Sequence, residues 1–310
     1  MNTHVTKYKL LLATDYSEAV MNAERYSVQF AKQTNSMLTL LYVYEFPISA
    51  PVKTTIFAEE MKSLEKSQLE RLTQHRNKLF SSLKIQHDEL ICNCVVSDGN
   101  VREQILKEAT EVVADFIIVG THGAGGFLET MFGSHSWDVI EKARIPVIAI
   151  PKDALFTEIK NIVIATEYRE GEIPIINFVS RFAKNFDAEV TVLHVTNYTL
   201  SKIDGAQMLE KFRNDINEKN SYPKLKMQLI KSENIAEGIN NYCSENKVDL
   251  LVMSPERLSL FEKIFFPKSI TKKMSFITNI PLMAVPDFYN PKFSERLKNF
   301  MHGSFVKKKL

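Results

Sequence analysis

The sequence predicts an α/β fold made of two similar domains, each a parallel β-sheet covered by helices on both faces. Three observations support this prediction. Short apolar runs alternate with amphipathic stretches along the chain, which is the pattern of β-α-β units. The chain repeats its own sequence at long range, and one apolar run leads directly into a glycine-rich segment. A repeat this long indicates duplicated domains rather than a solenoid of short units.

The first copy contains five apolar runs, separated mainly by stretches with helical periodicity. The longest of these stretches, at 57–83, carries apolar residues close to every third or fourth position. Such a stripe is more typical of a helix that packs on its own core than of a partner-binding surface. We expect strands near 8–14, 38–44, 91–96, 115–120 and 146–150, and helices near 17–34, 57–83, 100–111 and 134–143.

The second copy repeats the landmarks of the first in the same order. The matching segments are 9–18 with 161–170, 38–43 with 190–195, 115–119 with 249–253, and 145–151 with 280–286. The shift falls from 152 positions at the first pair to 135 at the last, so the second copy is shorter. We predict domains at 1–152 and 158–286, followed by a basic tail at 287–310.

Prolines bracket the last apolar run of each copy, at 146–150 and 281–285. Because proline has no N–H to donate to a β-ladder, each run is predicted to be an edge strand. An apolar edge invites pairing with another strand. We therefore expect the two edges to pair antiparallel across a pseudo-twofold axis, so that the domains form a pseudo-dimer within one chain.

The glycine-rich segment follows the apolar run 116–119 with the spacing G-x2-G-x9-G-[ST], formed by Gly120, Gly123, Gly133 and Ser134. α/β proteins bind phosphates where a strand leads through a glycine-rich turn into the start of a helix. Glycine lets backbone N–H groups approach an anion, and the helix N-terminus adds donors and a partial positive charge. The alternative is that these glycines only serve turns and close packing.

Composition sets broad limits on function. The formal net charge is +2, so no global field calls for nucleic acid or an anionic membrane as a partner. Three cysteines are too few for a disulfide framework and suit a reducing compartment; Cys92 and Cys94 are expected to pack in the core, with a redox or metal pair as the alternative. No apolar stretch approaches the length of a membrane span, and we expect a cytoplasmic protein.

These motifs together resemble the universal stress protein family. The strand that ends in Ala-Thr-Asp15-Tyr-Ser, the Leu-Tyr-Val43 strand, the glycine-rich loop and the Ile-Pro-Val-Ile edge carry the resemblance. The tandem repeat resembles the two-domain members of that family. The resemblance implies Rossmann-like domains of the adenine nucleotide α-hydrolase type, with strand order 3-2-1-4-5 and a ligand at the switch point.

The resemblance also implies ATP as the ligand, with or without a magnesium ion. In ATP-binding members the acid after the first strand faces the nucleoside and the valine of the second strand presents backbone groups to adenine. The loop glycines lie by the ribose and phosphates. Carried onto this chain, the positions are Asp15, Val43, Gly120, Gly123, Gly133 and Ser134, with His135 and Ser136 next in line. Asp15 is also placed to cap the following helix, and both roles are compatible.

The second copy departs from the motif. Glu167 and Val195 stand at the positions of Asp15 and Val43, but Ser254 and Arg257 replace the first two glycines. The Gly-Ser pair becomes either Pro-Lys or Lys-Ser within residues 267–269. We predict that the second copy is a structural or regulatory partner and that one nucleotide binds per chain.

The sequence favours nucleotide binding over turnover. No Gly-Lys pair occurs in the chain, which excludes a G-x-x-x-x-G-K-[ST] phosphate loop, and no general base accompanies an activated nucleophile. The leading hypothesis is an ATP-binding stress or signalling module with unidentified protein partners, as a monomeric pseudo-dimer or a further homodimer. The alternatives are an enzyme that slowly hydrolyses ATP or transfers a nucleotidyl or phosphoryl group, and a nucleotide-free scaffold.

Overall fold

The computed structural model describes residues 8–45, 55–121, 134–168, 170–196, 202–255 and 280–286. The predicted tail at 287–310 therefore lies outside the described residues. The first half contains β1 (Lys9–Thr14), α1 (Glu18–Gln33), β2 (Met37–Tyr44), α2 (Thr55–Ser82), β3 (Cys92–Asp98), α3 (Val101–Glu111), β4 (Phe116–Thr121), α4 (Ser134–Lys142) and β5 (Val147–Pro151). The second half contains β6 (Asn161–Ala165), η1 (Glu170–Glu172), α5 (Ile173–Ala183), β7 (Glu189–Thr196), α6 (Lys202–Lys219), β8 (Leu225–Lys231), α7 (Ile235–Glu245), β9 (Leu250–Met253) and β10 (Leu282–Ala284).

Each half has the predicted parallel sheet. The strand orders are β3-β2-β1-β4-β5 and β8-β7-β6-β9-β10, so the order 3-2-1-4-5 occurs twice. The chain reverses its direction of travel across the sheet between β1 and β4, and the loops after these two strands leave from the same edge. Ligands of open α/β sheets bind at this switch point.

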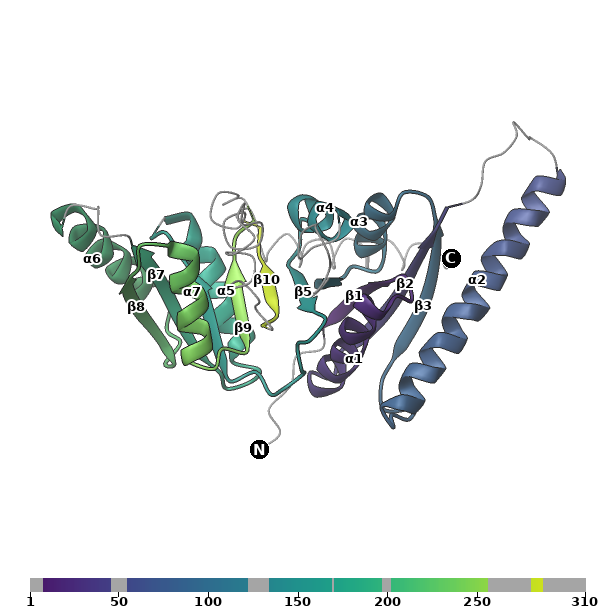
Figure 1. The fold of residues 1–310 in the computed structure, drawn as a ribbon, viewed down its shortest axis with the longest axis horizontal. Coiled ribbons are helices and arrows are strands. Elements are labelled where there is room, and N and C mark those ends of the chain that lie inside the picture. Colours follow the sequence, from purple (N-terminus) through teal and green to yellow (C-terminus); the bar gives the residue numbers. More distant parts are fainter. Residues whose placement is uncertain are drawn as a thin grey trace, which may run out of the picture.

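The two sheets join into one sheet of ten strands through β5 and β10, which lie side by side at the centre of the molecule (Figure 1). These two strands pair antiparallel, with Met283 opposite Ile148. The predicted pairing of the two proline-bracketed edges is thus confirmed. Pairing covers two apolar strands that would otherwise expose unpaired backbone groups.

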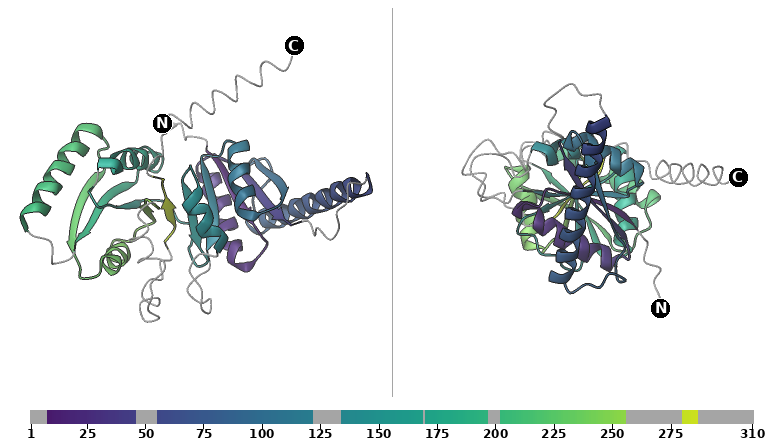
Figure 2. Two further views of the ribbon diagram at one scale, coloured as in Figure 1. Left: turned by 90° about the horizontal axis from the view of Figure 1, so that it is seen from above. Right: turned by 90° about the vertical axis from the view of Figure 1, so that its right-hand side faces the viewer.

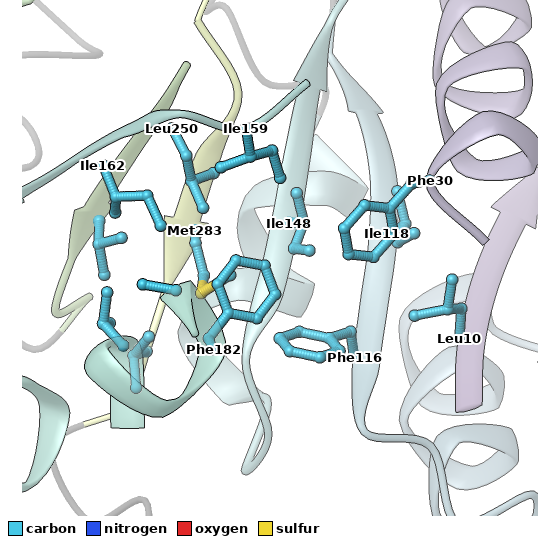
Figure 3. Close-up of a cluster of buried hydrophobic side chains, with 14 of the residues drawn as sticks. Leu10, Phe30, Phe116, Ile118, Ile148, Ile159, Ile162, Phe182, Leu250 and Met283 are labelled. Carbon is cyan, nitrogen blue, oxygen red and sulfur yellow. The ribbon is translucent and has the colours of Figure 1, made fainter. Parts of the chain in front are cut away.

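An aromatic cluster seals the contact between the halves. Phe182 of α5 packs on Phe116 of β4 and on Phe30 of α1, with ring centroids 5.7 and 6.3 Å apart (Figure 3). Phe30 and Phe182 occupy matching positions of the two copies and are both almost fully buried. Because one continuous core on this face contains residues of both halves, the halves form a single hydrophobic body.

Helices cover both faces of the sheet, as the sequence predicts. Core residues of α1 and α2 belong to one face of the first half, and those of α3 and α4 belong to the other. The long helix α2 lies against the outer strand β3 and extends past the end of the sheet (Figure 2). Leu72 and Leu79 of its predicted stripe are buried, whereas Met61 and Leu64 are only partly covered. The stripe therefore packs on the core along its C-terminal half.

Candidate functional site

A cavity of about 300 Å³ opens at the C-terminal ends of β1, β2 and β4. This volume is at the small end of the range for ligand sites. Four of the residues expected at a nucleotide site line it, and these are Asp15, Val43, Gly120 and Ser136. Residues far apart in the sequence thus meet at the switch point of the first half.

The turn after β1 positions Asp15 at the cavity. Asp15 is exposed, and its Oδ1 accepts a hydrogen bond of 2.9 Å from the backbone N–H of Ser17, which is the N-cap residue of α1. The carboxylate therefore stabilises the turn before the helix rather than the first helical turn itself. The next residue, Tyr16, has a φ of 63°, a conformation that is uncommon outside glycine. This tight turn directs the chain from β1 into α1.

The glycine-rich segment enters the site through its two ends. Gly120 lies in β4, opposite Ile150 of β5, and its carbonyl oxygen accepts a hydrogen bond of 3.1 Å from the Ser136 hydroxyl. Because Ser136 lies in the first turn of α4, this contact holds the N-terminal end of that helix beside the cavity. Ser134 and His135 begin the same helix. Gly123 and Gly133 lie outside the described residues.

Most of the cavity wall is apolar and was not predicted as part of the site. Val101 and Ile105 contribute from the first two turns of α3, and Val20 contributes from α1. The remaining lining residues are Ala13, Thr14, Leu41 and Val119. The sequence does contain a signal for this wall: Val101 and Ile105 have i, i+4 spacing directly after the third strand, which places both side chains on one helix face. A small apolar wall with a few polar groups is typical of sites for planar organic ligands.

Beneath the cavity lies a buried polar network that sequence reasoning also missed. The Thr14 hydroxyl donates a hydrogen bond of 2.5 Å to Oε1 of Glu24, which is 1% exposed. Nε2 of His75 lies 2.8 and 2.9 Å from the two carboxylate oxygens of Glu24. No sequence signal links these side chains, because 51 positions separate Glu24 from His75.

Tyr16 closes this network on the side of α2. Its ring lies 4.9 Å from the His75 ring and 4.7 Å from the Tyr42 ring, and the Arg71 guanidinium sits 4.5 Å above its face. Burial raises the pKa of the Tyr16 hydroxyl to about 12, so the hydroxyl stays neutral across the physiological range. The turn that carries Asp15 is therefore packed directly against α2.

The matching positions of the second half are packed shut. Ala13, Val43 and Gly120 are partly exposed, whereas their counterparts Ala165, Val195 and Ser254 are each at most 5% exposed. Gly238 of α7 explains part of this difference. A Cβ atom at Gly238 would lie only 2.7 Å from Cγ1 of Val195, so the absence of a side chain lets α7 approach β7 directly.

The rest of the second motif falls outside the described residues, including Arg257 and residues 267–269. Glu167, the counterpart of Asp15, is partly buried, and its backbone N–H donates to Oε1 of Glu172 at 3.1 Å. The hydroxyl of Ser254 is buried and has no hydrogen-bond partner among the described residues. The second half thus keeps the turn, and the positions that match the cavity lining of the first half are buried.

The cysteines are poor candidates for chemistry. Cys92 and Cys94 are both partly buried on β3, and burial raises the pKa of the Cys92 thiol to about 12 and that of Cys94 above its usual range. A neutral thiol is neither a good nucleophile nor a metal ligand. Within the described ranges, no group of three or more His, Cys, Asp or Glu residues is arranged to hold a metal ion. No helix in the same ranges is long and apolar enough to cross a membrane.

Comparison with known proteins gives a consistent result. The sequence pattern of the universal stress protein family matches residues 8–151 and 158–286. Among individual relatives, universal stress protein YxiE of Bacillus subtilis is 26% identical over 149 residues, which cover 46% of this chain and 97% of that protein. Universal stress protein MJ0577 of Methanocaldococcus jannaschii is 25% identical over 156 residues, covering 46% of this chain and 94% of the relative.

Two solved structures share the fold over nearly the whole chain. A universal stress protein from Archaeoglobus fulgidus superposes with a TM-score of 0.64 at 15% identity, covering 90% of this chain and 98% of that one. A Pseudomonas aeruginosa protein described as a candidate universal stress protein gives a TM-score of 0.55 at 14% identity, covering 96% of this chain and 100% of that one. The arrangement of two such domains in one body is therefore found in other proteins.

Proposed function

Since the chain belongs to the universal stress protein family, with two such domains, we propose that its first domain binds an adenine nucleotide, with ATP as the ligand. The observation that carries this proposal is the cavity at the first switch point, which brings Asp15, Val43, Gly120 and Ser136 together. Its apolar walls suit a planar base, and its polar groups lie at the strand ends. Such an arrangement is typical of nucleotide sites in open α/β sheets.

The nucleoside is assigned to the β1–β2 side of the cavity. Asp15 is exposed there, and a carboxylate is a good acceptor for ribose hydroxyl groups. The ladder between β1 and β2 ends at the Thr14–Tyr42 pair, so Val43 lies one residue beyond it. Backbone groups in that position are suited to reading the edge of adenine.

The phosphates are assigned to the start of α4. Gly120 and Ser136 lie at the two ends of the glycine-rich segment, and the N-terminus of α4 supplies N–H donors and a partial positive charge. We include Gly123, Gly133, Ser134 and His135 in this part of the site on the strength of the motif. A magnesium ion would join through the phosphates and water, since the described acids form no cage for it.

We expect one nucleotide per chain and no significant turnover. The packed positions Ala165, Val195 and Ser254 support an empty second domain. Among the described acids, Asp138 is the candidate to hold a metal near the loop, but it lies 3.7 Å from the Arg102 guanidinium and is half-exposed on α4. Phosphoryl transfer needs a positioned metal and a group that orients water. The protein is accordingly a cytoplasmic, nucleotide-responsive stress or signalling module.

The test begins with the small molecules released from freshly purified protein, identified by mass spectrometry, followed by titration calorimetry with ATP. Gly133→Val places a branched side chain where the phosphates are assigned, and should weaken ATP binding roughly a hundredfold, about 2.7 kcal/mol. Gly171→Val is the matched control, because a Cβ there meets nothing within 4 Å.

Unchanged ATP affinity in Gly133→Val would remove the phosphate assignment. No bound nucleotide and no ATP binding by the intact protein would favour the scaffold hypothesis. Steady phosphate or AMP release near one turnover per second, abolished by Gly133→Val, would instead make the protein an enzyme.

A further inference from the structure

A carboxylate–imidazole contact beneath the cavity connects the proposed nucleotide site of the first domain to helix α2. Glu24 comes from α1 and His75 from α2, and both Glu24 oxygens lie within 2.9 Å of Nε2 of His75. The exposed fractions of the two side chains are 2% and 24%. A carboxylate this deeply buried is costly to keep ionised unless it is paired, so His75 is its main source of compensation.

The pair reaches the cavity through one hydroxyl group. Thr14, which lines the cavity, donates its hydroxyl hydrogen to Oε1 of Glu24 at 2.5 Å. The same hydroxyl oxygen accepts a hydrogen bond of 3.2 Å from the backbone N–H of Tyr16. Because these bonds bracket Asp15, the carboxylate of Glu24 fixes the turn that presents Asp15 to the ligand.

We propose that Glu24 and His75 are positioning residues for this turn, and that the proton held by the pair makes nucleotide affinity dependent on pH. This inference rests on the proposed function of the first domain. With the proton present, the pair is neutral overall and the imidazolium donates a charge-assisted hydrogen bond. Without it, an uncompensated carboxylate lies beneath a site that must accept an anionic phosphate chain. Loss of the proton therefore weakens nucleotide binding.

The other ionisable groups around His75 do not offset the change in charge when the pair loses its proton. Tyr16 contacts the His75 ring and stays neutral because burial raises its pKa to about 12. Arg71, one helical turn before His75, is held over the Tyr16 ring, and Arg76 donates to the carbonyl oxygen of Cys92. Both cations are permanent charges. The further ionisable groups, which face Tyr16 from β2 and β3, are Tyr42 and Cys94.

The second domain holds the equivalent turn in a different way. Thr166 donates its hydroxyl hydrogen to Oε2 of Glu172 at 2.6 Å and accepts from the N–H of Tyr168, whose φ is 59°. The other oxygen of Glu172 accepts from a backbone N–H, that of Glu167. The histidine of this region, His194, instead stacks on Tyr168 and bonds to the carbonyl oxygen of Thr166 through Nδ1. Among the residues that the structure describes, the carboxylate–imidazole contact therefore occurs only in the domain with the open cavity.

The test measures ATP affinity by titration calorimetry between pH 5.5 and 8.0 for the wild type and for His75→Gln. Glutamine can still donate a hydrogen bond but cannot carry the proton. We expect wild-type affinity to fall about tenfold more over this range than that of His75→Gln, a coupling within the ordinary range for linked sites. ATP and every other side chain are common to both proteins, so the difference between the two profiles isolates His75.

Two further variants control for structure. His87→Gln changes an exposed histidine after α2 and should reproduce the wild-type profile. His75→Lys supplies a positive charge that persists at pH 8.0, so this variant should still bind ATP tightly at that pH. It keeps the test decisive if His75→Gln does not fold. Thermal unfolding at each pH establishes that every variant is folded in the titration.

The outcomes separate this inference from the proposed function. Wild type and His75→Gln profiles of equal slope, in proteins that bind ATP, would overturn the positioning role alone. A fall of affinity at high pH in His75→Lys, as steep as in the wild type, would do the same. Absence of ATP binding by the wild type at every pH would overturn the proposed function itself. Extra proton uptake by the wild type, measured in buffers of different ionisation enthalpy, would support the inference directly.

Discussion

The two domains share the turn after their first strand and differ in what lies above it. In both, a threonine hydroxyl donates to a buried glutamate and a tyrosine with positive φ follows two residues later. Above this shared turn the first domain has a cavity, whereas the second has Val195 in contact distance of the backbone of α7. The turn is therefore part of the shared fold, and the space beside it is what differs between the two domains.

The largest effect is expected on the free energy of unfolding, at a pair of residues that the two domains share. Phe30 and Phe182 are matching residues that pack on each other across the pseudo-twofold axis. Truncation of either to alanine should lower the free energy of unfolding by about 3–5 kcal/mol, as for other buried phenylalanines. Denaturant unfolding followed by fluorescence and circular dichroism measures this. Both variants should lose stability in one shared transition; a Phe182→Ala protein whose first domain unfolds at the wild-type midpoint would show that the halves are independent.

A smaller effect, on ATP affinity, should distinguish Asp15 from Glu167, the acids that follow the first strand of the first and second domain. Asp15→Asn removes the charged acceptor at the cavity rim and should weaken ATP binding about tenfold, close to 1.4 kcal/mol. Glu167→Gln is the matched change in the second domain and should leave the affinity unchanged. Titration calorimetry measures both, and the stoichiometry should be one ATP per chain. Two ATP sites of similar affinity, or equal losses of ATP affinity in the two variants, would show that the domains do not differ in nucleotide binding.

The smallest effect concerns the helix that closes the second domain. Gly238→Ala gains helix propensity but drives a methyl group to within 2.7 Å of Val195 and 2.8 Å of Ser232, so a net loss of about 1 kcal/mol is expected. The matched position in the first domain is Gln104, which is partly exposed on α3, and Gln104→Ala should change stability by less than about 0.5 kcal/mol. Thermal unfolding compares the two. A stabilised Gly238→Ala protein would mean that α7 has room to move away from β7.

The fold was predictable because its signals are local. Apolar runs gave the strands, and the prolines around 146–150 and 281–285 identified the edges that pair at the centre of the sheet. The convergence of Asp15, Val43, Gly120 and Ser136 followed from the rule that ligands bind at the switch point of an open sheet. Each of these inferences needs only the order of elements along the chain.

The parts that escaped prediction depend on which side chains meet between packed elements. Glu24 and His75 are unremarkable polar residues on two amphipathic helices until those helices lie together on one face of the sheet. From the sequence alone, Gly238 is a residue of low helix propensity within a helix. Its role becomes clear only from the close approach of α7 to β7. Contacts between helices and strands are set by rotation and depth, which a linear pattern does not encode. The binding roles of all eight site residues stay predictions, and these are Asp15, Val43, Gly120, Gly123, Gly133, Ser134, His135 and Ser136.

The antiparallel contact of β5 with β10 has a consequence for how this molecule can vary. In a homodimer built on the same axis, every substitution appears twice, and the complex dissociates on dilution. Here the two surfaces belong to one polypeptide, so their assembly does not depend on protein concentration and a substitution changes one side only. A mutation that closes one pocket leaves the other in place. One domain is consequently free to lose its ligand while it continues to cover the hydrophobic edge of its neighbour.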